Sequence, residues 1–149
     1  MTPNEILSRL PYSEPFLFVD KLYEIDENGV TGTFHFKEDL WFYKGHFRDN
    51  PVTPGVILTE CMAQIGVVSL GIFFLLIKEN PEISENKLMP KLAMSSSEVD
   101  FYLPVLPGEE VKVVSKKLYF RFNKLKCETE MFNASGNLVC RGKIAGMVY

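Results

Sequence analysis

Two ionisable residues, His46 and Glu60, stand fourteen positions apart in the stretch GHFRDNPVTPGVILTECMAQ, residues 45–64. His46 lies among residues typical of turns, and an imidazole with an ordinary pKa of about 6.5 can act as a base at neutral pH. Pro54 and Gly55 open a predicted helix, whose free backbone N–H groups can polarise a carbonyl oxygen. Together with an acid, these groups could abstract a proton next to a carbonyl and assist a departing hydroxyl.

Glu60 would be the acid, since it falls in the second turn of a helix whose other positions are mostly apolar. An isolated carboxylate is costly to bury, so such a group has a partner or a raised pKa. A carboxyl group that keeps its proton can serve as a general acid. Gln64 lies one turn further along the same face and could orient Glu60 through a hydrogen bond.

These residues depend on a long helix, which the sequence predicts from Gly55 to about Lys78. Apolar side chains surround nearly its whole circumference, which predicts that the rest of the chain encloses it. Its uninterrupted apolar run, residues 65–77, has thirteen residues, whereas a bilayer needs roughly 20. We therefore expect a buried core helix and no membrane span.

Strands are predicted on both sides of this helix. A short helix at residues 4–10 is followed by a strand over residues 16–25, a turn at residues 26–29 and a strand over residues 30–36. Three or four antiparallel strands are expected after the long helix. The pattern predicts one α+β domain over residues 1–149, in which an antiparallel sheet wraps around the helix. Since such a sheet leaves an exposed edge, we expect at least a homodimer.

The composition is that of one globular domain, with 149 residues, 46% hydrophobic and 23% charged. A net charge of -3 provides no overall attraction to nucleic acid. The three cysteines are an odd number without a metal-type spacing, and the first ten residues lack a basic segment followed by an apolar run. We expect reduced thiols and a cytoplasmic location.

Two other reactive side chains have simple structural interpretations. His35 alternates with Phe34 and Phe36 along the predicted strand, so we expect it to be an exposed residue without a catalytic role. Cys61 adjoins Glu60, but nothing nearby in the sequence indicates a lowered thiol pKa. We expect Cys61 to be a small buried packing residue.

The segment around His46 and Glu60 resembles the motif of the β-hydroxyacyl-acyl carrier protein dehydratases, the FabZ and FabA-like proteins. Its elements are a His-Phe pair, a Pro-Val-X-Pro-Gly segment and a carboxylate on the following helix, as in HFRDNPVTPGVILTECMAQ. LPYSEPFLFVD near the N-terminus and VDFYLPVLPGEEV further on are similar to other parts of the family pattern. The likeness thus covers most of the chain.

This resemblance implies the hot-dog fold, in which an antiparallel sheet wraps around one helix. It implies that His46 is the catalytic base and Glu60 the acid, and that the N–H of Gly55 binds the thioester carbonyl. Gly55 and Gln64 are the candidate substrate-binding residues. In that family the base and acid of one site come from different subunits. The implied reaction converts a 3-hydroxyacyl group on acyl carrier protein to a trans-2-enoyl group and needs no metal or cofactor.

The carrier protein would be an acidic partner, and a basic run at residues 116–126, KKLYFRFNKLK, could meet it. Strand alternation predicts Leu118, Phe120 and Phe122 on one face of this run. The other face would carry Lys117, Tyr119 and Arg121. A solvated outer strand explains the same pattern. The hypothesis of carrier binding involves some of Lys117, Arg121, Lys124, Arg48 and Lys91.

The sequence also departs from the family pattern. Tyr-Ser-Glu at residues 12–14 replaces a basic pair, Arg-Asp at residues 48–49 replaces a common Pro-Gly, and Thr53 replaces a typical methionine. An aromatic cluster, Trp-Phe-Tyr at residues 41–43, precedes His46. The sequence is therefore as compatible with a specialised lipid or polyketide-like pathway as with fatty acid synthesis. Two further functions stay open, a hot-dog thioesterase that activates water and a non-catalytic subunit that binds the acyl carrier.

Overall fold

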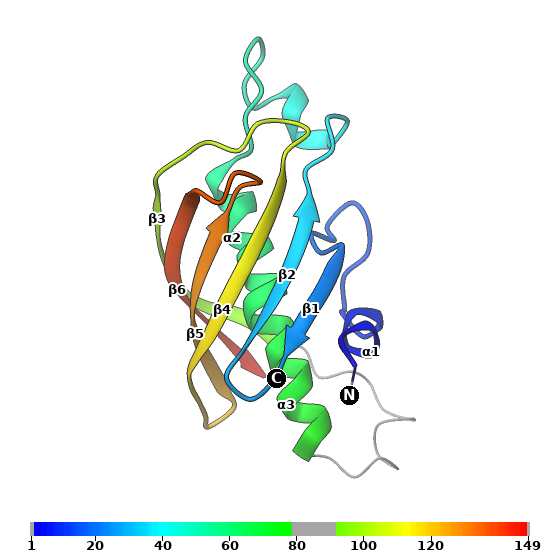
Figure 1. Cartoon of the computed structure of the whole chain (residues 1–149), viewed down its shortest axis with the longest axis vertical. Coiled ribbons are helices and arrows are strands. Elements are labelled where there is room, and N and C mark those ends of the chain that lie inside the picture. Colours follow the sequence, from blue (N-terminus) through cyan, green and yellow to red (C-terminus); the bar gives the residue numbers. More distant parts are fainter. Residues whose placement is uncertain (1, 79–91, 149) are drawn as a thin grey trace.

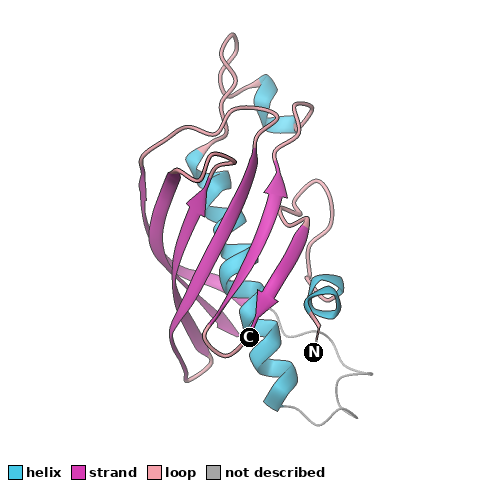
Figure 2. Ribbon diagram, viewed as in Figure 1, coloured by secondary structure: helices cyan, strands magenta, loops and turns pink. Residues whose placement is uncertain are grey.

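The computed structural model describes residues 2–78 and 92–148 and shows a six-stranded sheet curled around one long helix (Figure 1, Figure 2). This is the predicted hot-dog arrangement. The elements are α1 (Pro3–Ser8), β1 (Lys21–Ile25), β2 (Gly29–His35), the 3-10 helix η1 (Trp41–Lys44), α2 (Gly55–Ala63), the π-helix η2 (Gln64–Val68), α3 (Ser69–Lys78), β3 (Leu92–Phe101), β4 (Glu110–Arg121), β5 (Lys124–Phe132) and β6 (Leu138–Val148).

The strands follow the order β1-β2-β4-β5-β6-β3, and every neighbouring pair is antiparallel. The predicted hairpin is present as β1 and β2, and four strands follow the helix, as expected. The two edges of the sheet are β1 and β3. Side chains on the concave face pack against the helix, and their burial is the main source of stability.

The predicted long helix is confirmed as the continuous series α2, η2 and α3. Within the described residues, Gly55–Ile77 is long and apolar enough to span a membrane, but 78% of its apolar window is buried. It therefore has the character of a core helix. The sequence did not predict the π-turn in its middle, where the Ser69 hydroxyl donates to the Gln64 carbonyl over 2.9 Å.

This helix comes closest to the sheet at Gly66. The Ser115 hydroxyl of β4 donates to the Gly66 carbonyl over 2.9 Å. A Cβ atom at Gly66 would lie 2.8 Å from Cγ2 of Thr129 on β5. Only glycine fits this contact without a shift of helix or sheet.

The first strand is shorter than predicted, since β1 begins at Lys21 rather than at residue 16. The backbone of Phe16 and Phe18 is hydrogen-bonded to the side chain of Gln64 instead of to a neighbouring strand. A tertiary contact therefore replaces the pairing that the β-forming residues would favour.

The predicted alternation along residues 116–122 is also wrong, because a β-bulge interrupts the pairing of β4 with β5 between Lys117 and Tyr119. Lys117 and Phe120 both contact Phe74 of α3, Lys117 through its Nζ 5.0 Å above the ring and Phe120 by stacking at 5.3 Å. The two residues thus face the helix together, whereas Leu118 is exposed.

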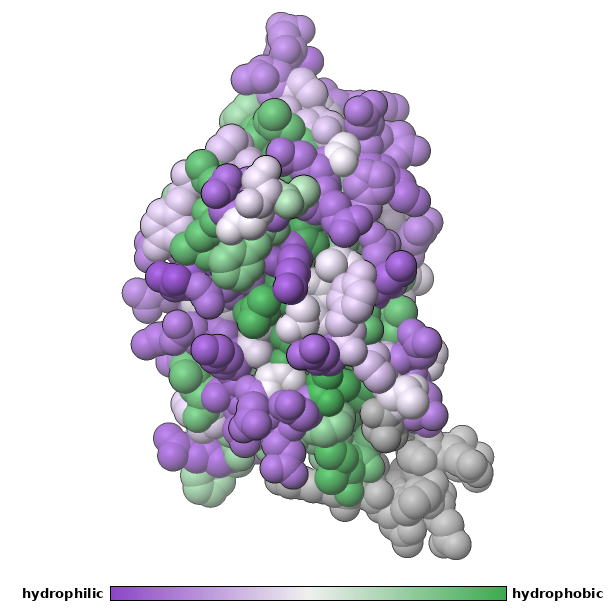
Figure 3. Space-filling model, viewed as in Figure 1, coloured by the Kyte–Doolittle hydropathy of each residue, from purple (hydrophilic) through white to green (hydrophobic). Residues whose placement is uncertain are grey.

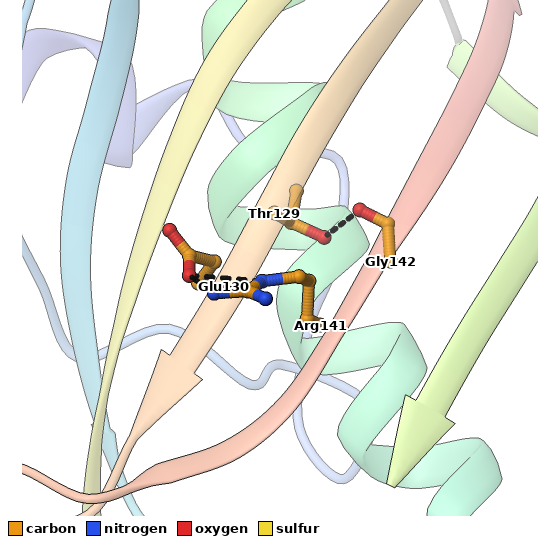
Figure 4. A network of polar contacts seen from close by, with 4 residues as sticks. All are labelled: Thr129, Glu130, Arg141 and Gly142. Carbon is orange, nitrogen blue, oxygen red and sulfur yellow. Dashed lines mark hydrogen bonds and ion pairs between the residues drawn. The ribbon is translucent and has the colours of Figure 1, made fainter.

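The two faces of the sheet carry different polar groups, as β5 and β6 show (Figure 4). Thr129 is buried, and its hydroxyl donates to the Gly142 carbonyl over 3.3 Å. Glu130 instead pairs with the exposed Arg141, whose Nε lies 3.0 Å from Glu130 Oε2. Such a surface ion pair contributes little to stability, because water screens the two charges.

Several apolar side chains remain at the surface, where they lie among hydrophilic ones (Figure 3). The expected enclosure of the helix fails at Val56 in its first turn, which is 77% exposed. Edge strand β3 is exposed along nearly its whole length, including Met94 and Phe101. No described part of the chain packs over these surfaces.

Candidate functional site

Glu60 lies in the second turn of α2, where Gln64 binds it. Gln64 Nε2 donates to Glu60 Oε1 and to the Phe16 carbonyl, each over 3.0 Å. Gln64 Oε1 accepts a hydrogen bond of 2.8 Å from the Phe18 N–H. Because a backbone N–H can only donate, Phe18 fixes which end of the amide faces Glu60. The predicted contact is therefore present, and Glu60 Oε2 is left without a partner among the described residues.

The environment of Glu60 favours its protonated form. Burial raises the pKa of Glu60 above its ordinary value, and the hydrogen bond from Gln64 lowers that pKa by a smaller amount. The carboxyl group therefore keeps its proton to a higher pH than an exposed glutamate does. This shift suits a general acid, which must hold a proton to deliver it.

A cavity of about 230 Å³ lies beside Glu60. Its wall is formed by α2 and η2, by the start of β3, by the end of β6 and by the segment after α1. Tyr12 and Glu60 are its two polar side chains. The other lining residues are apolar or small: Ala63, Val67, Val68, Leu92, Ala93, Met94, Ile144, Ala145 and Gly146.

His46 lies in the loop after η1, at the top of Figure 1, and is half-buried. Its Nδ1 is 2.9 Å from the Val52 carbonyl, and the Val52 N–H donates to the His46 carbonyl over 2.9 Å. The ring stacks on Phe47 at 4.1 Å. Since a carbonyl can only accept, Nδ1 carries the proton, and Nε2 of a neutral ring is free to accept one.

Gly55 is the first residue of α2, so its N–H has no carbonyl partner within the helix. It lines a second cavity, of about 350 Å³, together with Thr53, Leu58 and Phe101 among others. A Cβ atom at Gly55 would lie 3.2 Å from the Phe101 ring. A side chain at this position would therefore crowd the Phe101 ring.

Two departures from the family pattern contact each other beside this second cavity, which Thr53 lines. The Tyr43 hydroxyl lies 2.6 Å from Thr53 Oγ1, and both residues are buried. Burial raises the pKa of Tyr43, the bond to Thr53 lowers it by less, and Glu109 raises it slightly. The polar Thr53 therefore has a partner from the aromatic cluster, which stabilises the loop that leads to Gly55.

The structure does not bring His46 and Glu60 of one chain together. His46 is absent from the wall of the cavity beside Glu60, and its ring bonds to Val52. The loop of His46 projects beyond the start of α2 (Figure 1). None of the described hydrogen bonds joins the two residues within one chain.

The remaining candidates behave mostly as expected. His35 is exposed, with Nε2 3.0 Å from the Gly108 carbonyl. Cys61 is fully buried, and burial raises the pKa of its thiol well above the ordinary value, which disfavours the nucleophilic thiolate. All three cysteines are free. Within residues 2–78 and 92–148, no group of three His, Cys, Asp or Glu side chains is arranged to hold a metal ion.

The basic residues do not form one surface on a single chain. Arg121 and Lys124 flank the turn between β4 and β5, at the bottom of Figure 1, whereas Arg48 lies in the loop at the top. Lys91 falls outside the described residues.

Sequence reasoning missed Tyr12 and the backbone groups of Phe16 and Phe18 as parts of the site. The segment LPYSEPFLFVD was recognised only by its likeness to the family, and its tyrosine only as a departure. Its contacts with Gln64 join residues 46 and 48 positions apart, which no local pattern indicates.

The sequence profile of the FabA-like domain matches residues 10–147. A 3-hydroxyacyl-[acyl-carrier-protein] dehydratase FabZ from Clostridium perfringens (strain SM101 / Type A) is 34% identical over 148 residues, 97% of this chain and 96% of that protein. A FabZ from Caldicellulosiruptor saccharolyticus is 34% identical over 146 residues, 95% of this chain and 94% of that protein.

Solved structures share the fold. The dehydratase heterocomplex ApeI:P from Xenorhabdus doucetiae has a TM-score of 0.78 at 15% identity, over 100% of this chain and 92% of that chain. A hypothetical thioesterase with coenzyme A from Streptococcus pneumoniae TIGR4 has a TM-score of 0.60 at 12% identity, over 87% of this chain and 84% of that chain. The fold alone therefore does not separate dehydration from thioester hydrolysis.

Proposed function

Because the chain belongs to the FabA-like family, we propose that it dehydrates 3-hydroxyacyl thioesters on acyl carrier protein to trans-2-enoyl thioesters. Its FabZ relatives, similar over nearly the whole chain, are named for this reaction. The observation that carries the proposal is the state of Glu60: a carboxyl with a raised pKa, bound through Oε1 by Gln64, on the wall of an apolar cavity.

In the proposed reaction His46 and Glu60 act on neighbouring carbons. Nε2 of His46 takes a proton from C2 of the acyl group, and the electron pair of that bond forms the C2=C3 double bond. The C3–O bond breaks, and Glu60 gives its proton to the departing oxygen, which leaves as water. The proton on His46 then returns to Glu60 through solvent. The Gly55 N–H would hold the thioester oxygen, where negative charge develops.

A complete site would combine His46 of one chain with Glu60 of another, since one chain keeps them apart. The exposed edge β3 and the exposed Val56 offer a surface on which a second chain could pack. A homodimer is the simplest assembly. The alternative assembly is a heteromer with a related subunit, which the similar ApeI:P structure supports because it is a heterocomplex.

The acyl carrier protein is the proposed partner, and the turn between β4 and β5 is its proposed contact. Arg121 and Lys124 flank this turn, and Phe122 at its tip is 90% exposed. Charge reversal at Arg121 and Lys124 should raise KM for the carrier-bound substrate, and more so at low salt. An unchanged KM would leave this turn as a solvated surface. Arg48 lies in the loop after η1, so charge reversal there is a separate test.

The decisive experiment is mass spectrometry of a 3-hydroxyacyl group on acyl carrier protein after incubation with the protein. Loss of one water, abolished in both His46→Ala and Glu60→Gln, would support dehydration. Release of the carrier thiol would instead indicate a thioesterase. Unchanged substrate across several chain types would favour the non-catalytic or partner-dependent subunit.

A cytoplasmic location and a role in fatty acid or specialised lipid synthesis belong to the same proposal.

A further inference from the structure

The cavity beside Glu60 contains one polar side chain that the proposed reaction does not use. Tyr12 follows α1 and Pro11, its ring packs against the core, and the residue lines the cavity. Besides Glu60, the other lining residues are apolar or glycine. Tyr12 is only partly buried and its hydroxyl stays accessible, so it can reach a molecule that enters the cavity.

The state of the Tyr12 hydroxyl suits a hydrogen-bond donor. Burial raises the pKa of Tyr12, and the nearby charge of Glu60 raises it further, so the phenol keeps its proton throughout the physiological range. Within residues 2–78 and 92–148 the hydroxyl has no hydrogen-bond partner. Glu60 itself is bound on its other oxygen by Gln64. Whenever Glu60 is protonated, two O–H groups, of Tyr12 and of Glu60, are thus available to the same cavity.

We propose that Tyr12 donates a hydrogen bond to the 3-hydroxyl oxygen of the substrate, beside the proton that Glu60 delivers to the same oxygen. This inference rests on the proposed dehydration. The hydroxyl oxygen has two lone pairs, so it can accept from both groups at once. As the C3–O bond lengthens, negative charge grows on this oxygen, and the bond from Tyr12 strengthens. Tyr12 keeps its proton, so the balance of the reaction is unchanged.

The substitution Tyr12→Phe separates this role from packing, because it removes the hydroxyl and keeps the ring. The matched control is Tyr23→Phe, the same change at an exposed position on β1. Two quantities are measured for each variant: kcat/KM with 3-hydroxyacyl carrier protein, and the inhibition constant of a saturated acyl carrier protein without the hydroxyl. Thermal unfolding is recorded alongside.

Tyr12→Phe should lower kcat/KM by about tenfold to a hundredfold, since a donor to a developing charge is lost. The inhibition constant of the saturated analogue and the melting temperature should stay unchanged, and Tyr23→Phe should behave as the wild type. An unchanged kcat/KM in Tyr12→Phe would overturn the proposal. So would equal weakening of turnover and of the saturated analogue, which would show a packing role. If the wild type removes no water, the proposed function itself fails, and the role of Tyr12 falls with it.

Discussion

Gln64 binds Glu60 Oε1 over 3.0 Å while the Phe18 N–H, 2.8 Å from Gln64 Oε1, fixes the orientation of the amide. One side chain thus connects the candidate acid on the helix to the segment before β1. Gln64 is fully buried and so is its bond to the Phe18 N–H, which bulk water cannot replace.

Replacement of Gln64 by leucine should destabilise the protein. The Phe18 N–H and the Phe16 carbonyl would lose their partner inside the protein, which costs about 2–4 kcal/mol of unfolding free energy. Urea denaturation measures this value. Ser69→Ala, which removes one buried hydrogen bond to the Gln64 carbonyl, is the control. Equal effects of the two substitutions would mean that Gln64 has no special structural role.

Glu60→Gln should change how stability depends on pH. The folded-state pKa of Glu60 is raised by burial above the unfolded value of about 4.3. The stabilising contribution of its proton is therefore complete below the unfolded pKa and is lost as pH rises through the folded pKa. The unfolding free energy of Glu60→Gln, relative to wild type, should rise over this interval and then level off. Denaturation at several pH values measures it, with the exposed Glu24→Gln as control. A flat difference would contradict the raised pKa.

Mixing two inactive variants should restore activity if the site spans two chains. A homodimer of His46→Ala or of Glu60→Gln would have no intact site. Random reassortment of the two makes half the dimers mixed, each with one intact site of two, so about a quarter of wild-type activity should return. Dehydration is assayed after joint refolding of the variants. No recovery, despite mixed dimers seen by native mass spectrometry, would place both residues in one chain's site.

Gly66→Ala should lower the unfolding free energy by about 1–3 kcal/mol, because the added methyl overpacks a tight contact. The new Cβ would lie 2.8 Å from Thr129 Cγ2 and 2.9 Å from Ser115 Cβ. Gly45→Ala is the control, since nothing lies within 4 Å of a Cβ there. Thermal and urea unfolding compare the two variants. Similar stability of both would show that the helix moves away from the sheet at little cost.

The features that local patterns could predict are those set by neighbours in the sequence. The bond between Gln64 and Glu60 follows from their spacing of one helical turn, and the helix from its apolar length. The shortened β1 and the bulge at Leu118 depend instead on contacts with α2–α3 that only the folded chain makes. The position of Tyr12 in the cavity wall could not be predicted for the same reason, since its neighbours in the cavity include residues of β3 and β6.

The π-turn at Gln64–Val68 has a consequence for how the chain tolerates changes in length. A π-turn accommodates one residue more than a regular helical turn while the helix on either side continues in phase. The extra residue therefore acts like an insertion that is confined to the π-turn. The half of the helix with Glu60 and the half with Phe74 keep the orientation that they would have in a regular helix. Deletion of one residue within the turn would restore a regular helix without rotating either half. In the core of this fold, an inserted or deleted residue can thus be absorbed inside a buried helix, and not only in loops.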